Sequence, residues 1–400
     1  MHSKKIILIS VIILAIHTPG KSMRPLYAAS GSSSGTLRIW DLSHKKGTKK
    51  KCIKALKKHP HSIICNIRFH PKDENIILTK MQPKYQSRRE SFTTELWDLS
   101  KDEGSEHIAT LHIGYHKESL HPTNKNIIAA PTAQNTFSIW SITKQGEKTL
   151  LKTVHGHKRT VSCLVFHPTE NIIASASADG TIMFCKTTDG TWTDTACIKN
   201  LKMRRVHICE ILFNHHTPHL ITVITIEGAI EIWNWYTKKQ ICSLHEHRGL
   251  INKLLYHPSN QHIAVSSSLD NTIKIWRTNN STWNDTHCIK TFYSGTNTSC
   301  LAFIDPTDQN LLASNCSDSI VHTWDISHPN GMEMIDTFYI HADHTTALAF
   351  SQCVDTTTKH EQQDENERYL FLQKTMTHTT NIRMPRKNLI ALTALFDSKQ

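Results

Sequence analysis

The sequence predicts an all-β protein made of seven copies of one unit of short strands. One observation is a tryptophan-bearing segment that recurs through most of the 400 residues. Another is a succession of runs of about four to eight residues, rich in Ile, Val and Thr and separated by Pro, Asn, Asp and Gly, which is typical of short strands. A third is that no apolar run reaches the roughly 18 residues of a membrane-spanning helix.

The recurring segment is clearest in GTLRIWDLS at 35–43 and NTIKIWRTN at 271–279. Its aromatic anchor returns at intervals of 43 to 57 residues. A period of that size indicates one supersecondary unit repeated along the chain. The anchor of the fourth unit is a cysteine in place of tryptophan. The seven anchors are Trp40, Trp97, Trp140, Cys185, Trp233, Trp276 and Trp324.

Each unit is predicted to contain four strands in a fixed order. The first ends in an aromatic residue and a His-Pro-like turn, as in CLVFHPTEN at 163–171, and the second follows at once, as in IIASASADG at 172–180. The third strand carries the anchor, and the fourth ends near His or Gly, as in CIKALKKH at 52–59. Turns spaced so regularly exclude a helical solenoid.

These residues resemble those of the WD-repeat family of β-propellers. The family's Gly-His signature is found at Gly156-His157. The resemblance covers about residues 24–351 and implies an all-β fold, a seven-bladed β-propeller of four-stranded antiparallel blades, with eight blades as the alternative. The Trp-Asp dipeptide that names the family stands at Trp40-Asp41, Trp97-Asp98 and Trp324-Asp325.

The resemblance also implies a hydrogen-bonded relay of His, Ser or Thr, Asp and Trp inside a blade. A buried indole N–H needs an acceptor, a hydroxyl passes the bond on, and a carboxylate fixes the imidazole. The sixth unit matches all four positions, the fourth lacks only the tryptophan, and the seventh lacks only the histidine. The residues concerned are His247, Ser266, Asp270 and Trp276 in the sixth unit, His157, Ser175 and Asp179 in the fourth, and Ser314, Asp318 and Trp324 in the seventh.

A Ser-His-Asp set also has the residue types of a hydrolase triad. Here the serine belongs to a strand instead of an exposed turn, and the tryptophan is expected to cover it. The resemblance therefore implies a non-enzymatic scaffold, a monomeric ring that recognises other proteins or peptides through loops on one rim. No cofactor is expected.

The chain is basic, with 46 Lys and Arg against 34 Asp and Glu and a formal net charge of +12. This excess makes a binder of nucleic acid or anionic surfaces the alternative function, and a propeller enzyme the weakest one. Eight lysines form a cluster between residues 45 and 58, with no aromatic platform for bases nearby. We favour an edge-protecting outer strand for this lysine cluster, since lysines discourage strand addition. Its members are Lys45, Lys46, Lys49, Lys50, Lys51, Lys54, Lys57 and Lys58.

Histidine pairs suggest a metal site, but they lack a third and fourth ligand at defined spacing, and no metal is expected. The pairs are His155-His157, His215-His216 and His245-His247. Eleven cysteines follow the repeat, and equivalent places in different blades lie too far apart for a disulfide. They are predicted to be free, buried thiols. Those at repeat positions are Cys52, Cys197 and Cys288 in fourth strands and Cys163 and Cys300 in first strands.

Residues 1–20 allow two interpretations. Lys4-Lys5 followed by the apolar run 6–16 has the order of a secretory signal peptide. The segment 11–20 also fits the first strand and turn of a blade. Against export stand eleven apparently unpaired cysteines and the lack of a small-x-small cleavage site. We favour the signal peptide, and export with it, over a cytoplasmic protein whose first blade begins here.

The other end of the propeller offers a strand for the first blade. HTTALAFSQ at 344–352 matches the first strand of the other units. If residues 1–20 are removed, this strand is expected to join the first unit and close the ring with strands from both chain ends. Residues 352–400 are then a C-terminal extension. The alternative, a degenerate eighth repeat, would put Pro385 at the anchor position of a central strand.

Overall fold

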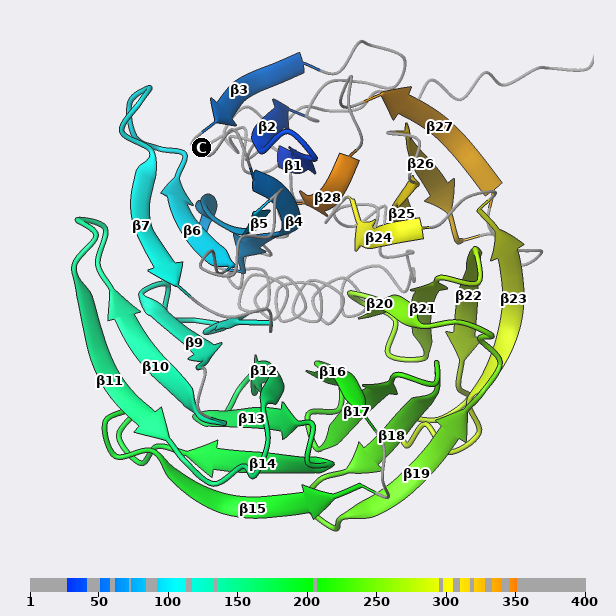
Figure 1. Ribbon diagram of the computed structural model, residues 1–400. Helices are drawn as coiled ribbons and strands as arrows, with labels where there is room; N and C mark the ends of the chain where they lie inside the picture. Colours follow the sequence, from blue (N-terminus) through cyan, green and yellow to red (C-terminus); the bar gives the residue numbers. More distant parts are fainter. Residues whose placement is uncertain are drawn as a thin grey trace, which may run out of the picture.

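Figure 1 shows the computed structural model, in which seven four-stranded antiparallel sheets form a ring. The structure describes residues 27–41, 51–57, 62–71, 73–83, 92–112, 117–132, 135–203, 207–294, 298–304, 310–316, 320–327, 333–339 and 345–350. In these ranges all the regular secondary structure is β-strand. They contain no helix long and apolar enough to cross a membrane. The predicted seven-bladed propeller is confirmed.

The blades are numbered along the chain, and the four strands of each run from the ring axis outward. Blade 1 contains β28 (Thr345–Phe350), β1 (Tyr27–Ser32), β2 (Thr36–Asp41) and β3 (Lys51–Lys57). Blade 2 contains β4 (Ser62–His70), β5 (Asp73–Pro83), β6 (Thr93–Asp98) and β7 (His107–His112). Blade 3 contains β8 (Ser119–Leu120), β9 (Ile127–Pro131), β10 (Phe137–Ile142) and β11 (Lys148–Val154).

The remaining four blades follow the same plan. Blade 4 contains β12 (Val161–Phe166), β13 (Ile172–Ser177), β14 (Thr181–Lys186) and β15 (Ala196–Lys202). Blade 5 contains β16 (Ile208–Phe213), β17 (Leu220–Thr225), β18 (Ile230–Asn234) and β19 (Lys239–Leu244). Blade 6 contains β20 (Ile251–Tyr256), β21 (Ile263–Ser268), β22 (Thr272–Arg277) and β23 (His287–Tyr293). Blade 7 contains β24 (Thr298–Phe303), β25 (Leu311–Cys316), β26 (Ile320–Asp325) and β27 (Glu333–Tyr339).

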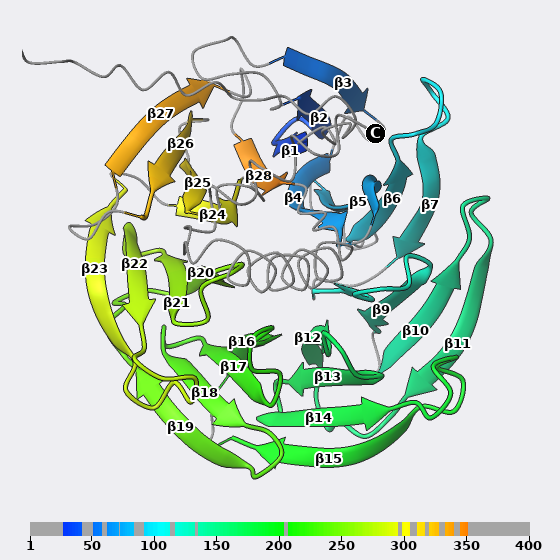
Figure 2. The ribbon, with the colours of Figure 1, turned by 180° about the vertical axis from the view of Figure 1, so that it is seen from behind.

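The first strand of each blade lies nearest the ring axis and the fourth lies at the periphery, from either side of the molecule (Figure 1 and Figure 2). Strand direction alternates within a blade because all pairings are antiparallel. The turns between second and third strands therefore fall on the same face as the links between blades. We call this the connection face, and we call the opposite face, which carries the other two turns of each blade, the hairpin face.

The ring is closed by strands from both ends of the propeller. Strand β28 pairs antiparallel with β1, from Ala28 opposite Phe350 to Ser32 opposite Thr345. It also lies against the first strands of both neighbouring blades, β4 and β24. The prediction that this segment supplies the first strand of blade 1 is confirmed for residues 345–350. Residues 1–20 and 352–400 lie outside the described residues, so the signal peptide and the extension remain predictions.

The seven anchors occupy one place in the seven blades. Each lies in the third strand, directly after a register shift between the third and fourth strands, as at Ile39/Trp40, Phe184/Cys185 and Ile275/Trp276. The same shift precedes the anchors of the other four blades. A bulge inserts one residue and turns the strand locally. Cys185 is therefore the structural equivalent of the six tryptophans.

The hydrophobic core lies between blades and not within one of them. Each of six clusters of buried side chains joins consecutive blades, from blades 1 and 2 to blades 6 and 7. A four-stranded sheet has two faces to cover, and the next blade covers one of them. Each blade therefore depends on its neighbours for burial.

Three further tryptophans fill the spaces between blades 3 to 6, and the repeat pattern did not predict their role. Trp235 stacks on Phe184 of the preceding blade at 4.7 Å. Trp192 and Trp283 lie in the turns between third and fourth strands of blades 4 and 6, and both are buried with positive φ angles of 67° and 60°. Bulky residues rarely adopt that conformation, so the surrounding structure must hold it.

The prediction of buried thiols holds for Cys163 but is wrong for the fourth strands. Cys52 and Cys197 are exposed and Cys288 is half-buried, because the fourth strand is the outer edge of its blade. The prediction also considered disulfides only between cysteines of different blades. Within blade 4, the structure places Cys185 opposite Cys197.

Candidate functional site

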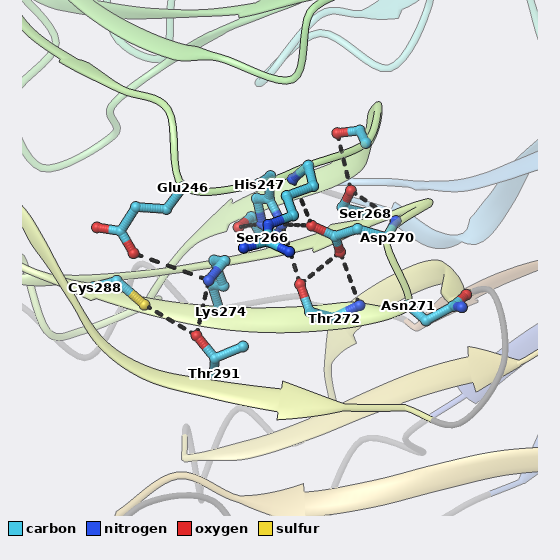
Figure 3. Close-up of polar contacts among 12 residues, drawn as sticks. Glu246, His247, Ser266, Ser268, Asp270, Asn271, Thr272, Lys274, Cys288 and Thr291 are labelled. Carbon is cyan, nitrogen blue, oxygen red and sulfur yellow. Dashed lines mark hydrogen bonds and ion pairs between the residues drawn. The ribbon is translucent and has the colours of Figure 1, made fainter.

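The predicted relay residues of blade 6 lie in one chain of hydrogen bonds, of which Figure 3 shows Ser266, His247 and Asp270. Trp276 Nε1 donates to Ser266 Oγ at 2.8 Å, and Ser266 Oγ lies 2.7 Å from His247 Nε2. His247 Nδ1 lies 2.9 Å from Asp270 Oδ2. With the proton on Nδ1, the imidazole donates to the carboxylate and accepts from the serine, so the donors run from Trp276 to Ser266, from Ser266 to His247, and from His247 to Asp270.

The local turn holds the acidic end of this relay in place. Asp270 Oδ1 accepts from the backbone N–H and the hydroxyl of Thr272 at 2.9 and 2.6 Å, and Oδ2 accepts from Arg248 N at 2.9 Å. Burial raises the pKa of Asp270, but hydrogen bonds from Thr272 and His247 lower it to about 2. Burial lowers the pKa of His247, against the attraction of Asp270. The relay therefore contains a fixed carboxylate and a neutral imidazole near neutral pH.

The incomplete relays of blades 4 and 7 keep part of this arrangement. In blade 4, His157 Nε2 lies 2.8 Å from Ser175 Oγ, while Nδ1 lies 3.0 Å from the Thr181 hydroxyl and 3.5 Å from Asp179. In blade 7, Trp324 Nε1 donates to Ser314 Oγ at 2.8 Å. Asp318 lies outside the described residues.

Two hydroxyl acceptors were missed by the sequence analysis. Trp40 Nε1 donates to Ser30 Oγ at 2.8 Å, and Trp97 Nε1 donates to Thr79 Oγ1 at 2.9 Å. Ser30 precedes Trp40 by ten residues, as Ser266 precedes Trp276, so this offset was a readable signal. Thr79 precedes its tryptophan by eighteen residues, which hid it.

Blades 3 and 5 carry no hydroxyl at the equivalent place in the second strand. Register puts Ala130 there in blade 3 and Val223 in blade 5. Trp233 Nε1 instead donates to Glu231 Oε2 at 2.9 Å. In blade 5 the indole is therefore paired by an acceptor of its own strand, so the relay varies between blades while the anchor position does not.

The histidines that end first strands are tied into the turns that follow them. His167 Nδ1 accepts from Glu170 N at 2.9 Å, and its Nε2 donates to Pro218 O of the next blade at 3.2 Å. His257 Nδ1 accepts from Asn260 N at 3.0 Å. Burial lowers the pKa of both histidines. These residues are turn supports that link one blade to the next.

Three histidines of the pairs that were considered and not favoured as metal ligands contact other protein groups. His216 Nε2 donates to His257 O at 2.8 Å, and His215 Nε2 donates to Pro258 O at 3.4 Å. His245 contacts Ser243 at 2.8 Å. Among the described residues no three His, Cys, Asp or Glu side chains gather as metal ligands would.

The first strands of blades 2 to 7 line an inner cavity of about 430 Å³. Glu210 and Lys253 occupy equivalent places, three residues before the aromatic that ends each strand. Glu210 contacts Lys117 at 2.8 Å and Lys253 at 3.7 Å. Burial raises the pKa of Glu210, but Lys117 and Lys253 lower it to about 2. With Arg68, three cations face one carboxylate in this cavity.

Among the described residues, three large apolar side chains of the connection face are in contact with water. Ile226 is in the turn between β17 and β18, Leu269 is in the equivalent turn of blade 6, and Tyr293 ends β23 beside Thr272. Their exposed fractions are 55%, 46% and 81%. Blades 5 and 6 are neighbours, so these three side chains lie on one side of this face, and we call them the apolar patch.

The predicted lysine cluster is only partly open to solvent. Lys57 is exposed, but Lys54 Nζ lies 3.1 Å from buried Glu106 Oε1 and donates to Leu99 O and Lys101 O at 3.1 and 3.0 Å. Lys54 therefore joins blade 1 to blade 2. The side chains of the other six lysines lie outside the described part of the chain.

A closed ring of seven four-stranded sheets is a β-propeller. Its blades share an anchor position, and blade 6 carries a complete His-Ser-Asp-Trp relay. The family model described as "WD domain, G-beta repeat" matches residues 148–185 and 238–277, the segments that end in Cys185 and just after Trp276. Two segments of the chain, in blades 3 to 4 and 5 to 6, are therefore similar to the WD-repeat family.

Similar curated proteins are matched over a minor part of their own length. The GATOR2 complex protein WDR24 of Danio rerio is 22% identical over 235 residues, covering 58% of this chain and 29% of the relative. The transcriptional corepressor LEUNIG_HOMOLOG of Arabidopsis thaliana is 23% identical over 249 residues, covering 62% and 28%. The nuclear distribution protein nudF of Emericella nidulans is 30% identical over 165 residues, covering 38% and 35%. The match spans less than a third of the first two relatives' length.

Proposed function

We propose that the protein is a non-enzymatic scaffold that binds a protein or peptide partner through its connection face. The observation that carries this proposal is the exposed patch of Ile226, Leu269 and Tyr293 on a closed ring. Exposed apolar residues on neighbouring elements mark interaction sites, and aromatic anchors contribute much of the binding energy. A rigid ring presents such a patch with little ordering cost.

The relatives support a protein partner. WDR24 is named as a protein of the GATOR2 complex, and LEUNIG_HOMOLOG as a transcriptional corepressor. A partner for this chain, and a monomeric ring that binds it, are part of the proposal. The partner's identity is not specified by the fold.

The Ser266–His247–Asp270 set is proposed to be structural and not catalytic. Ser266 and the His247 side chain are completely buried, and the Ser266 oxygen already accepts from Trp276. A nucleophile needs room for an acyl group about 3 Å away and donors for the oxyanion. Burial of both residues leaves no such room.

The test is quantitative capture of partners from an extract with the full chain and with the triple variant Ile226→Glu, Leu269→Glu and Tyr293→Glu. The proposal predicts loss of specific partners by the variant. The matched control is Leu150→Glu, Ile198→Glu and Ile289→Glu, whose exposed apolar residues lie on outer strands. If the triple variant captures the same partners as the native chain, the connection face is not the binding surface.

The anionic-surface alternative rests on the net charge of +12. Its direct test is salt, because binding to phosphates weakens steeply as ions compete. The engagement of Lys54 with Glu106 removes one member of the lysine cluster from such a surface. The Debye length falls by about half between 50 and 200 mM salt. Partner binding that does not change over this range would contradict the anionic-surface alternative.

A further inference from the structure

Blade 4 brings two thiols together. Cys185 Sγ and Cys197 Sγ lie 2.7 Å apart, and the two residues face each other in the pairing of β14 with β15. Residues directly opposite in antiparallel strands have Cα atoms about 4.5–5.5 Å apart, which is within the range that a disulfide spans. The backbone therefore needs no rearrangement for a bond between these sulfurs.

Comparison with other blades shows why the pair is special to blade 4. In blades 1 and 6 the fourth-strand cysteine faces the tryptophan anchor, as Cys52 faces Trp40 and Cys288 faces Trp276. Blade 4 has the same fourth-strand cysteine, but its anchor is Cys185. The fourth-strand cysteine thus meets a second thiol where its equivalents meet an indole.

The two thiols differ in access. Cys185 is completely buried against the core between blades 3 and 4, whereas Cys197 is exposed on the outer strand. The hydrogen bond from the Cys185 thiol lowers the pKa of Cys197. An external reagent would therefore meet Cys197 first, with Cys185 directly behind it.

We propose that Cys185 and Cys197 are a redox modification site that forms a disulfide between the third and fourth strands of blade 4. The oxidant is a low-molecular-weight disulfide such as oxidised glutathione. The Cys197 thiolate attacks one of its sulfurs, the glutathione S–S bond breaks, and one glutathione thiolate leaves. Cys185 releases its proton, attacks the Cys197 sulfur, and displaces the second glutathione. Two cysteine thiols are oxidised, and one disulfide is reduced to two glutathiones.

The bond would close the turn between β14 and β15, which contains Trp192. Closing a loop of this length restricts the unfolded chain. We expect the oxidised protein to melt about 5 °C higher than the reduced protein. The outer strand β15 would then be tied to β14 covalently as well as by its hydrogen bonds.

The test is mass spectrometry of the full chain after incubation with oxidised glutathione and alkylation of the remaining thiols. Trypsin cuts after Lys186, so the proposed bond joins peptide 160–186 to peptide 187–199. Fragmentation distinguishes Cys185 from Cys163, which is in the same peptide. The proposal predicts this linked pair, and its disappearance in Cys185→Ser and Cys197→Ser but not in the control Cys288→Ser.

Three results would overturn the proposal. One is that both cysteines stay open to alkylation under the oxidant. Another is that Cys197 stops at the mixed disulfide with glutathione, because Cys185 then does not reach it. The third is a bond from either cysteine to a different one. The native chain is sufficient for this test, so it does not depend on how well the serine variants fold.

Discussion

Ser266 has two hydrogen-bond partners in blade 6, since it accepts from Trp276 and lies within hydrogen-bonding distance of His247. Ser266→Ala leaves both of these buried groups without that partner. Each unpaired buried polar group costs roughly 1–3 kcal/mol, so the free energy of unfolding should fall by about 2–4 kcal/mol. Urea unfolding followed by fluorescence measures the change.

The control is Ser281→Ala, an exposed serine in the turn before β23. It should change the free energy of unfolding by less than about 0.5 kcal/mol. Blade 3 has Ala130 at the place of Ser266, so alanine fits a blade and the variant should still fold. Equal stabilities of the two variants would contradict the structural role of the relay.

Buried histidines predict a loss of stability in mild acid. Among the described residues, burial lowers the pKa of seven histidines, in the case of His121 from 6.5 to about 4. The unfolded chain therefore binds more protons than the folded chain below pH 6.5, and the free energy of unfolding falls from there toward pH 4. His121 alone contributes on the order of 3 kcal/mol. The seven are His70, His121, His157, His167, His215, His247 and His257.

Blade 5 shows which substitution of His121 would keep this turn, because Asn214 occupies the equivalent place there. His121 Nδ1 accepts from Thr123 N and Asn124 N, and in blade 5 Asn214 Oδ1 accepts in the same way from His216 N and Thr217 N. His121→Asn should keep the turn and reduce the slope of stability against pH between 6.5 and 4. Thermal unfolding at pH 7.5, 6, 5 and 4 measures this slope. An unchanged slope would show that His121 does not titrate in this range.

The anchors could be predicted from the sequence because they recur at nearly even intervals. The blade 6 relay could be predicted because its residues lie at fixed offsets from the anchor. Thr79 was not, because a longer turn in blade 2 breaks the ten-residue spacing from Trp97. The Cys185–Cys197 pair was missed for a different reason. Cysteines were compared at equivalent positions across blades, whereas this contact joins two different positions within one blade.

Lys54 links strand β3 to blade 2 through its contact with Glu106, which can be tested directly. Lys54→Met leaves the buried Glu106 carboxylate without its cation. Removing one member of such a pair is destabilising, and partial exposure of Lys54 reduces the effect, so we expect a loss of about 1–3 kcal/mol. Calorimetry or urea unfolding measures it.

Lys57→Met is the control for this experiment, since Lys57 is exposed on the same strand and also belongs to the lysine cluster. It should have little effect on stability. If both lysines prove equally dispensable, Lys54 acts only as part of a solvated edge.

Strand order and turn positions followed from the repeat, but the contents of two turns did not. The turns before β15 and β23 share Trp, Asp, Thr and Cys at the same offsets, ending in Cys197 and Cys288. Their tryptophans are buried by neighbouring blades, as Trp192 is against His121 of blade 3 at 5.6 Å. Periodicity describes what every unit shares, so it could not predict a buried tryptophan in a turn that only two blades have.

Closure of the ring depends on β28, which contributes the innermost strand of blade 1. A chain that ends after His344 loses this strand, whereas a chain that ends after Gln352 keeps it. We expect the shorter chain to melt much lower and to elute as a larger or aggregated species, because β1 and β4 lose their covering strand. Gel filtration and thermal unfolding of the two chains test this. Equal behaviour would contradict the closure.

The number of blades and the use of both chain ends were predicted because each blade has one anchor and the C-terminal strand matches the other first strands. The partner was not, because the propeller fold is shared by proteins of different function. The apolar patch arises from turn residues that differ between blades, namely Ile226 and Leu269, and from the end of one outer strand, Tyr293. Only the arrangement of blades places them on one face.

Hydrogen exchange of the full chain tests most directly whether the two chain ends complete one blade. Protection reports the free energy of opening for each strand. The closed ring predicts that amides in Tyr27–Ser32 and Thr345–Phe350 exchange as slowly as those of second strands such as Ile263–Ser268. Fast exchange in both segments, beside slow exchange in the other blades, would show that the ring is open between blades 7 and 1.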